Sequence, residues 1–162
     1  MNNNEFYLAD AIDIIEEVLA GGGEFRMYPK GTSMLPLLVQ GEDSVILRRR
    51  KGIPAKKHDI IFYRRDNGQF ILHRVLKVCP DDSYILCGDN QTLLEPNIRS
   101  EQIIGYVSGI YKKDRLLSTT SFSFRVYMIF WMWMPYRRMF LFIKRCFRFL
   151  KRRIGQRGKH RQ

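Results

Sequence analysis

Three side chains of the types that serve nucleophilic catalysis stand in short stretches of the sequence. Ser33 lies in KGTSMLPLL, His73 lies in the apolar run QFILHRVLKV, and Asp89 lies in GDN. A serine hydroxyl is a weak nucleophile near neutral pH and needs a base, which a neutral imidazole can supply. Taken one at a time, the same residues have ordinary structural roles as a helix cap, a hydrogen-bonded core residue and a turn former.

The elements that must position these residues are mainly strands. From residue 24 to residue 111 the chain alternates short β-branched or aromatic runs with turn formers, namely EFRMYP, DSVILRR, DIIFYRR, QFILHRVLKV, SYILCG and IIGYVSGIY. RDNGQ separates two of these runs, and its Asn-Gly pair predicts a hairpin with a type I′ turn. The pattern predicts a mainly β domain with an antiparallel, partly closed sheet.

An amphipathic helix is expected before this domain, at about residues 5–20. Apolar residues recur at three- and four-residue steps and acidic residues take the other side, with Leu8, Ala11, Ile12, Ile15, Val18 and Leu19 facing away from Asp10, Asp13, Glu16 and Glu17. The three glycines at 21–23 then end the helix, because glycine readily takes the left-handed conformation of a helix C-terminus. The segment lacks the basic start and the continuous apolar core of a signal peptide.

The net charge of +12 is unevenly distributed and divides the chain. Residues 1–114 hold 15 Lys and Arg against 16 Asp and Glu, whereas residues 115–162 hold 13 Lys and Arg and no acid. We therefore expect an N-terminal helix with its glycine joint at 1–23, a near-neutral β domain at 24–114 and a basic tail at 115–162.

The tail is rich in both aromatic and basic residues between positions 122 and 154. After Pro135, which ends or kinks a helix, apolar and basic side chains gather on opposite helical faces. The apolar face holds Met139, Phe140, Phe142, Ile143, Cys146, Phe147, Phe149, Leu150 and Ile154, and the basic face holds Arg137, Arg138, Lys144, Arg145, Arg148, Lys151 and Arg152. This pattern predicts a basic amphipathic helix in the interface of an anionic membrane. Packing on the β domain and binding of nucleic acid are alternatives, and the aromatic block favours lipid over nucleic acid.

No metal or other cofactor is expected. No two of the three histidines have the spacing of metal ligands, and the three cysteines form no CxxC pair. His58, in KKHDII, is expected to be a turn residue that opens a strand.

Four stretches in this order, GTSMLPLLVQGEDSVIL, HRVLKV, ILCGDN and EQIIGYVSGIY, resemble the type I signal peptidase superfamily, which includes the self-cleaving phage and SOS repressors. The resemblance covers about residues 24–111. Its most specific part is the Ser-Met-x-Pro box that begins at Ser33, with the Gly-x-Asp-x-Val that begins at Gly41.

The resemblance implies a serine endopeptidase with Ser33 as nucleophile and its backbone N–H in the oxyanion hole. Most bacterial members place a lysine base where this chain has His73, so the chain looks like the histidine-type signal peptidases. Asp89 is the preferred candidate to orient His73. Histidine-type enzymes usually carry a further aspartate pair after that motif, whereas QTLLEPN offers only Glu95, so Asp89, Glu95 or neither remain open. Met34 and Leu35 are expected to line the apolar cleft for small substrate side chains.

The expected function is cleavage of a precursor or leader peptide at or near a membrane, by a protein that its C-terminal segment holds there. Two other classes remain open. One is a non-catalytic peptide-binding module that keeps the peptidase fold, and the other is a self-cleaving regulator, which needs a DNA-binding segment that the short N-terminal helix does not provide.

Overall fold

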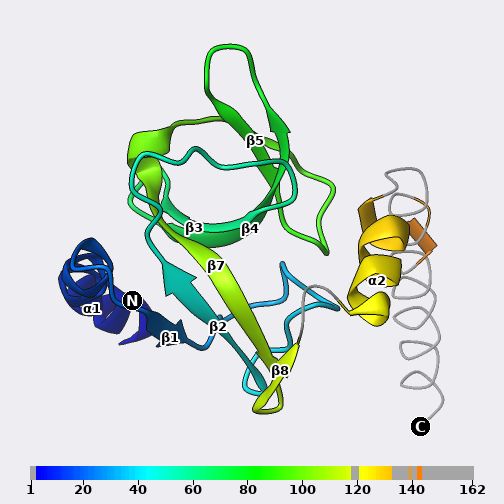
Figure 1. Ribbon diagram of the computed structural model, residues 1–162, viewed down its shortest axis with the longest axis horizontal. Coiled ribbons are helices and arrows are strands. Elements are labelled where there is room, and N and C mark those ends of the chain that lie inside the picture. The colour runs from blue at the N-terminus through cyan, green and yellow to red at the C-terminus, as the bar shows by residue number, and fades with distance from the viewer. Residues whose placement is uncertain (1–2, 118–120, 133–138, 140–141, 144–162) are drawn as a thin grey trace, which may run out of the picture. The chain divides into compact units, whose positions relative to one another are not determined.

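The computed structural model describes residues 3–117, 121–132, 139 and 142–143, and it divides into two units, Met1–Thr119 and Thr120–Gln162 (Figure 1). The first unit contains α1 (Asn3–Ala20), β1 (Phe25–Met27), β2 (Asp43–Arg48), β3 (Ile60–Arg64), β4 (Phe70–Val78), β5 (Tyr84–Cys87), β6 (Glu95–Ile98), the 3-10 turn η1 (Ser100–Gln102), β7 (Ile103–Lys112) and β8 (Arg115–Leu117). The second contains α2 (Phe122–Met132). Because β8 pairs with β7, the sheet continues to Leu117, three residues beyond the boundary that the charge distribution suggested.

All strands pair antiparallel in one sheet, in the order β1-β2-β7-β3-β4-β5-β6, with β8 attached to β7. The prediction of a mainly β, antiparallel domain is therefore confirmed. The prediction of partial closure was wrong, because β1 and β6 are the two ends of an open sheet. Pro96 in β6 has no N–H to donate and Asn97 has a φ of 60°, so this short strand cannot extend the ladder to another partner.

β3 and β4 form the hairpin that RDNGQ predicted, with Arg65 N–H donating to the Gln69 carbonyl oxygen at 2.9 Å. The type I′ turn was wrong. Such a turn needs a positive φ at both central residues, and of Asn67 and Gly68 only the glycine has one, at 84°. The loop instead belongs to the longer hairpin connections that end in a left-handed glycine.

The core lies on one face of the curved part of the sheet. It is a cluster of buried side chains from β3 to β7, together with one from the loop before β3: Ala55, Ile61, Tyr63, Val75, Tyr84, Leu86, Ile98 and Tyr106. The ribbon bends strongly through β3 and β4, which gives the cluster a concave wall (Figure 1). His73 of β4 therefore sits in a rigid part of the fold rather than in a loop.

α1 packs on the sheet through a narrow apolar edge. Ile12, Ile15 and Leu19 are buried, whereas Asp13 and neighbouring acids are exposed. The Leu19 Cδ1 atom lies only 3.0 Å from the point where a Cβ on Gly105 of β7 would be, so the glycine allows the helix to approach the strand closely. The helix ends as its glycines predict, with Gly23 N–H donating to the Val18 carbonyl oxygen at 2.9 Å.

A buried carboxylate fastens the loop between β1 and β2 to β7. Asp43 is 1% exposed, and it accepts hydrogen bonds from Val39 N–H at 2.7 Å, from Lys113 N–H at 3.2 Å and from the Lys112 ammonium. Burial by itself would raise the pKa of Asp43, but these donors outweigh it and hold the pKa below its ordinary value. The Lys112 ammonium also donates to the Leu37 carbonyl oxygen at 2.9 Å, so one cation ties two points of the loop to the sheet.

We predict that Asp43→Asn lowers the free energy of unfolding by about 1–3 kcal/mol, because the neutral amide replaces an ionised acceptor of buried donors. Urea titration at neutral pH measures the loss, with the exposed Asp13→Asn as the control. Since the folded state depresses the pKa of Asp43, its contribution is present above about pH 4 and lost as the pH falls further. The difference between wild type and Asp43→Asn should therefore shrink in acid. A variant as stable as wild type at neutral pH would contradict the anchoring role.

Candidate active site

Ser33 lies in a compact turn between β1 and β2. The turn is held from within by Leu38 N–H, which donates to the Met34 carbonyl oxygen at 2.9 Å, and from below by the burial of both of these residues. Gly31, two residues before Ser33, has a φ of 89°, a conformation that suits glycine and brings no hydroxyl to this position. Ser33 itself is partly exposed.

The GDN segment after β5 joins this turn to the sheet. Asn90 N–H donates to the Ser33 carbonyl oxygen at 2.7 Å, and the Asn90 side-chain amide donates to the Thr32 carbonyl oxygen at 3.0 Å. The two bonds clamp the backbone on either side of Ser33. A segment more than fifty residues away in the sequence thus fixes where the candidate nucleophile lies.

Gly88 is the point where Ser33 and His73 meet. A Cβ atom on Gly88 would lie 2.7 Å from the Ser33 carbonyl oxygen and 2.9 Å from His73 Nε2, both far inside normal van der Waals contact. The two residues therefore border the same glycine from different elements. Glycine is required here because backbone and imidazole already occupy the space that any side chain would need.

His73 is buried in β4, with 1% of its surface exposed, and its Nδ1 faces a carboxylate. Nδ1 lies 2.9 Å from Glu95 Oε1 and 3.4 Å from the Tyr63 hydroxyl oxygen. With the carboxylate ionised, Nδ1 carries the proton and donates to Glu95, which leaves the lone pair on Nε2, the nitrogen that faces Gly88. This is the tautomer that a general base acting on Ser33 needs.

Glu95 is itself fixed by two further side chains. The Tyr63 hydroxyl donates to Oε2 at 2.7 Å, and the Arg65 guanidinium donates to Oε2 at 2.7 Å and to Oε1. Burial alone would raise the pKa of Glu95, but these donors outweigh it and lower the pKa, so the carboxylate stays ionised at neutral pH. Burial is also the main reason that the pKa of His73 is lowered; the Glu95 charge opposes that effect and Arg65 adds to it.

The preference for Asp89 as the acid that orients His73 is not supported by this arrangement. Asp89 is fully buried and accepts two hydrogen bonds from Arg74, at 2.8 and 2.7 Å. Arg74 follows His73 directly in β4, so its side chain projects to the other face of the strand. The Asp89 carboxylate, which is bound to Arg74, therefore lies on that face and not beside Nδ1 of His73. Glu95, the alternative that the sequence left open, is the acid that the structure places on Nδ1.

One contact that a resting catalytic dyad can show is missing. Within the described part of the chain, no hydrogen bond joins the Ser33 hydroxyl to His73 Nε2, and the bonds of the imidazole run through Nδ1. Gly88 nevertheless borders both the Ser33 backbone and His73 Nε2. Catalytic hydrogen bonds are often long in structures without substrate.

A small cavity of about 80 Å³ opens beside Ser33. Met34, Leu38 and Leu72 line it with apolar side chains, and Ser33 and Gly31 are also among its lining residues. Met34 thus lies where the resemblance implied, whereas Leu35 is not among the lining residues. The volume suits a side chain of a few atoms.

His58 occupies the turn before β3, as expected, and has a φ of 80°. Its N–H donates to the Val75 carbonyl oxygen at 2.8 Å, and its own carbonyl oxygen accepts from Arg74 at 3.0 Å. The residue is exposed and takes no part in the network around His73. No group of three or more His, Cys, Asp or Glu among the described residues could hold a metal ion.

Most of the predicted amphipathic tail lies outside the described residues. Its first part is α2, and Phe122 and Ile129 on that helix are 83% and 71% exposed. Met139, Phe142 and Ile143 are exposed as well. In the part of the chain that the structure describes, no helix is both long and apolar enough to cross a bilayer.

A comparison of the chain with models of known protein families gives no match, and a comparison with curated proteins gives none either. The function must therefore be inferred from the site itself.

We predict that His73 titrates below its ordinary pKa of about 6.5 and that Glu95→Gln lowers this pKa further, because the Glu95 charge favours the imidazolium. NMR titration of the imidazole resonances measures both values. Glu101→Gln, which removes a charge from exposed η1, is the matched control and should leave His73 unchanged. An unchanged or raised His73 pKa in Glu95→Gln would contradict the pairing.

Proposed function

We propose that this chain is a serine endopeptidase of the signal peptidase type, with Ser33 as nucleophile and His73 as general base. The observation that carries the proposal is the approach of the Ser33 backbone and His73 Nε2 to the same glycine, Gly88. Glu95, which lies 2.9 Å from Nδ1, takes the orienting role in place of Asp89.

In the proposed reaction, Ser33 Oγ attacks the carbonyl carbon of the scissile bond while His73 Nε2 takes the hydroxyl proton. The C–N bond then breaks, His73 gives the proton to the departing amine, and an acyl-enzyme remains. His73 next takes a proton from water, whose oxygen attacks the ester carbonyl carbon. The C–O bond to Ser33 then breaks, His73 returns the proton to Ser33 Oγ, and the carboxylic acid product leaves. Glu95 stabilises the imidazolium that forms in each half of the reaction.

The substrate is a precursor or leader peptide with a small side chain next to the scissile bond. The cavity of about 80 Å³ beside Ser33 supports this choice, because its volume and its apolar lining residues suit a small side chain better than an aromatic one. The basic segment at 122–154 would hold the enzyme at an anionic membrane surface, through apolar residues such as the exposed Phe122 and Ile129 and through its many basic residues, with no acidic residue in the segment.

A non-catalytic peptide-binding module is the second candidate. The missing hydrogen bond between the Ser33 hydroxyl and His73 favours it, as does the deep burial of the imidazole. A binding module would keep the small cavity and the clamp on the Ser33 turn but would not cleave peptides.

We predict that Ser33→Ala reduces peptide cleavage by about a thousandfold or more, because no other group supplies the nucleophile. Cleavage of a peptide library that varies the residues around a small side chain, followed by mass spectrometry, measures the rate. Ser108→Ala, on an exposed part of β7, is the matched control and should keep full activity.

Circular dichroism of Ser33→Ala should match wild type, which separates a lost nucleophile from a lost fold. No cleavage by the wild-type protein would favour the binding module instead. Fragments of the chain itself, produced on incubation and absent from Ser33→Ala, would point to the self-cleaving regulator.

We predict that the full chain co-sediments with vesicles that contain anionic lipid and that a chain ending at residue 119 does not, because the unbalanced positive charge lies beyond that point. Binding of the full chain should weaken as salt is added. Neutral phosphatidylcholine vesicles are the control. Equal binding by both chains would overturn the proposed role of the tail.

A further inference from the structure

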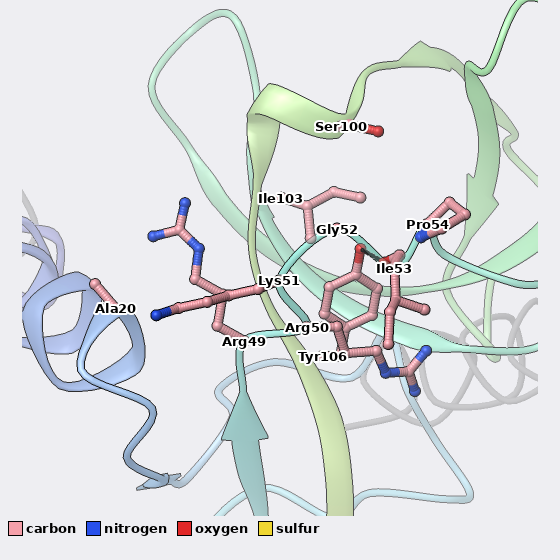
Figure 2. A pocket seen from close by; sticks show the side chains of 10 residues that line it. All are labelled: Ala20, Arg49, Arg50, Lys51, Gly52, Ile53, Pro54, Ser100, Ile103 and Tyr106. Carbon is pink, nitrogen blue, oxygen red and sulfur yellow. Dashed lines mark hydrogen bonds between the residues drawn. The ribbon is translucent and has the colours of Figure 1, made fainter.

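A second cavity, larger than the one beside Ser33, lies elsewhere in the β domain. It has a volume of about 730 Å³ and lies between the loop from β2 to β3 and the start of β7, with the end of α1 at its edge (Figure 2). Sites of this volume commonly take a small molecule or a few residues of a peptide. None of the residues that line this cavity takes part in the catalytic proposal, so that proposal does not explain the cavity.

Two cations stand at this cavity without an acidic partner. Arg49 and Lys51 form no ion pair within the described part of the chain, and both are exposed. Figure 2 shows their charged ends projecting on the side of α1, next to Ala20. Arg50, between them, is different, because it donates to Asp59 Oδ2 at 2.6 Å and lies 4.6 Å from the centre of the Tyr106 ring.

Apart from Ser100, the rest of the lining is largely apolar. Ile53, Pro54, Ile103 and the Tyr106 ring lie on the other side of the cavity from the ends of Arg49 and Lys51 (Figure 2). Ile53 is 52% exposed, so a ligand in the cavity can contact its apolar side chain. A ligand that matches this lining has negative groups at one side and an apolar group at the other.

Among anionic ligands, an acidic peptide fits better than a nucleotide. A base would need an open aromatic face, but Arg50 covers the Tyr106 ring and the Tyr106 hydroxyl is turned toward the Ile53 carbonyl oxygen, 3.5 Å away. The positive groups are also separate, flexible side chains rather than a ring of backbone N–H groups around one phosphate. Glutamate and aspartate side chains spaced along a peptide can meet such charges one by one.

Tyr106, which lines the cavity, lies in the same row of paired residues across the sheet as His73, the candidate base. Ile61 of β3 is paired with His73 on one side and with Tyr106 on the other. Two strand spacings amount to about 10 Å, a distance that an extended peptide covers in about three residues. This separation is short compared with the length of a polypeptide substrate.

We propose that this cavity is an exosite that binds an acidic segment of the polypeptide substrate, with Arg49 and Lys51 as its charged contacts and Ile53 as its apolar contact. The inference rests on the proposed peptidase function for the identity of the ligand as substrate. Binding itself does not require cleavage, so the two proposals can fail separately.

The test uses the full chain carrying Ser33→Ala, which can bind peptides without cutting them. Fluorescence anisotropy measures its affinity for a short labelled peptide with three glutamates around a leucine, and for the same peptide with glutamines. We expect the glutamate peptide to bind about tenfold more tightly or better, and Arg49→Glu with Lys51→Glu to remove this preference.

The matched control is Lys56→Glu with Lys57→Glu, which makes the same change in net charge on the same loop but outside the cavity lining. It should keep most of the preference for the glutamate peptide. An equal loss in both double variants would assign the effect to overall charge, including that of the basic tail, and would overturn the exosite. Equal affinity for the two peptides would overturn it as well.

Anionic vesicles provide the remaining arm. The double variant Arg49→Glu with Lys51→Glu is tested for binding to these vesicles as well. If it binds vesicles more weakly while its peptide affinity is unchanged, the surface recognises lipid and the peptide proposal is overturned. If the exosite is intact but wild type cleaves nothing, the binding result stands and the catalytic proposal fails.

Discussion

The absence of a side chain at Gly88 is the constraint on which the candidate site depends. The Ser33 carbonyl oxygen and His73 Nε2 both lie inside the volume that a Cβ there would fill, so even alanine would push the turn and the strand apart. Asn90, two residues later, pulls the Ser33 turn toward the same place through its N–H. Within this one segment, Gly88 avoids a steric clash with the Ser33 turn and with His73, and Asn90 supplies a hydrogen bond to the Ser33 turn. The geometry of the site is set by backbone contacts, which do not depend on the side-chain rotation of Ser33.

The buried pair of Arg74 and Asp89 gives this segment its second support. Both side chains are almost completely buried, and the bidentate contact joins β4 to the GDN segment from the face opposite His73. A buried ion pair gains little net stability, because desolvation offsets most of the attraction. Its effect here is positional, since an Asp89 carboxylate left without Arg74 would be an uncompensated charge in the core. The pair therefore restrains the loop that holds Gly88 and Asn90 in register with His73.

Much of this arrangement could be predicted from the sequence, and what could not has a physical reason. Short β-branched or aromatic runs between turn formers predicted six of the eight strands, whereas β6 and β8 were not predicted. The sheet was expected to close partly, but its strand order ends at β1 and at β6, which do not pair with each other. Ser33 and His73 could be named as candidates from their surroundings in the chain. The choice between Asp89 and Glu95 could not, because it depends on which face of β4 each carboxylate reaches, and the neighbouring Arg74 competes for one of them. Arg65, next to the hairpin turn, gave no signal in the sequence that it would hold Glu95.

The distribution of charge around His73 explains how a buried imidazole can serve as a base. At rest, the positive charge of Arg65 balances the negative charge of Glu95. With a neutral imidazole, the network of His73, Glu95 and Arg65 therefore has no net charge. Burial disfavours the imidazolium, which keeps His73 unprotonated and ready to accept a proton at neutral pH. In the proposed reaction, the charge that His73 gains from the Ser33 proton lies 2.9 Å from a carboxylate that is already oriented by Tyr63 and Arg65. Little reorganisation is then needed at that moment, and this is the condition under which buried electrostatic groups favour a transition state over a ground state.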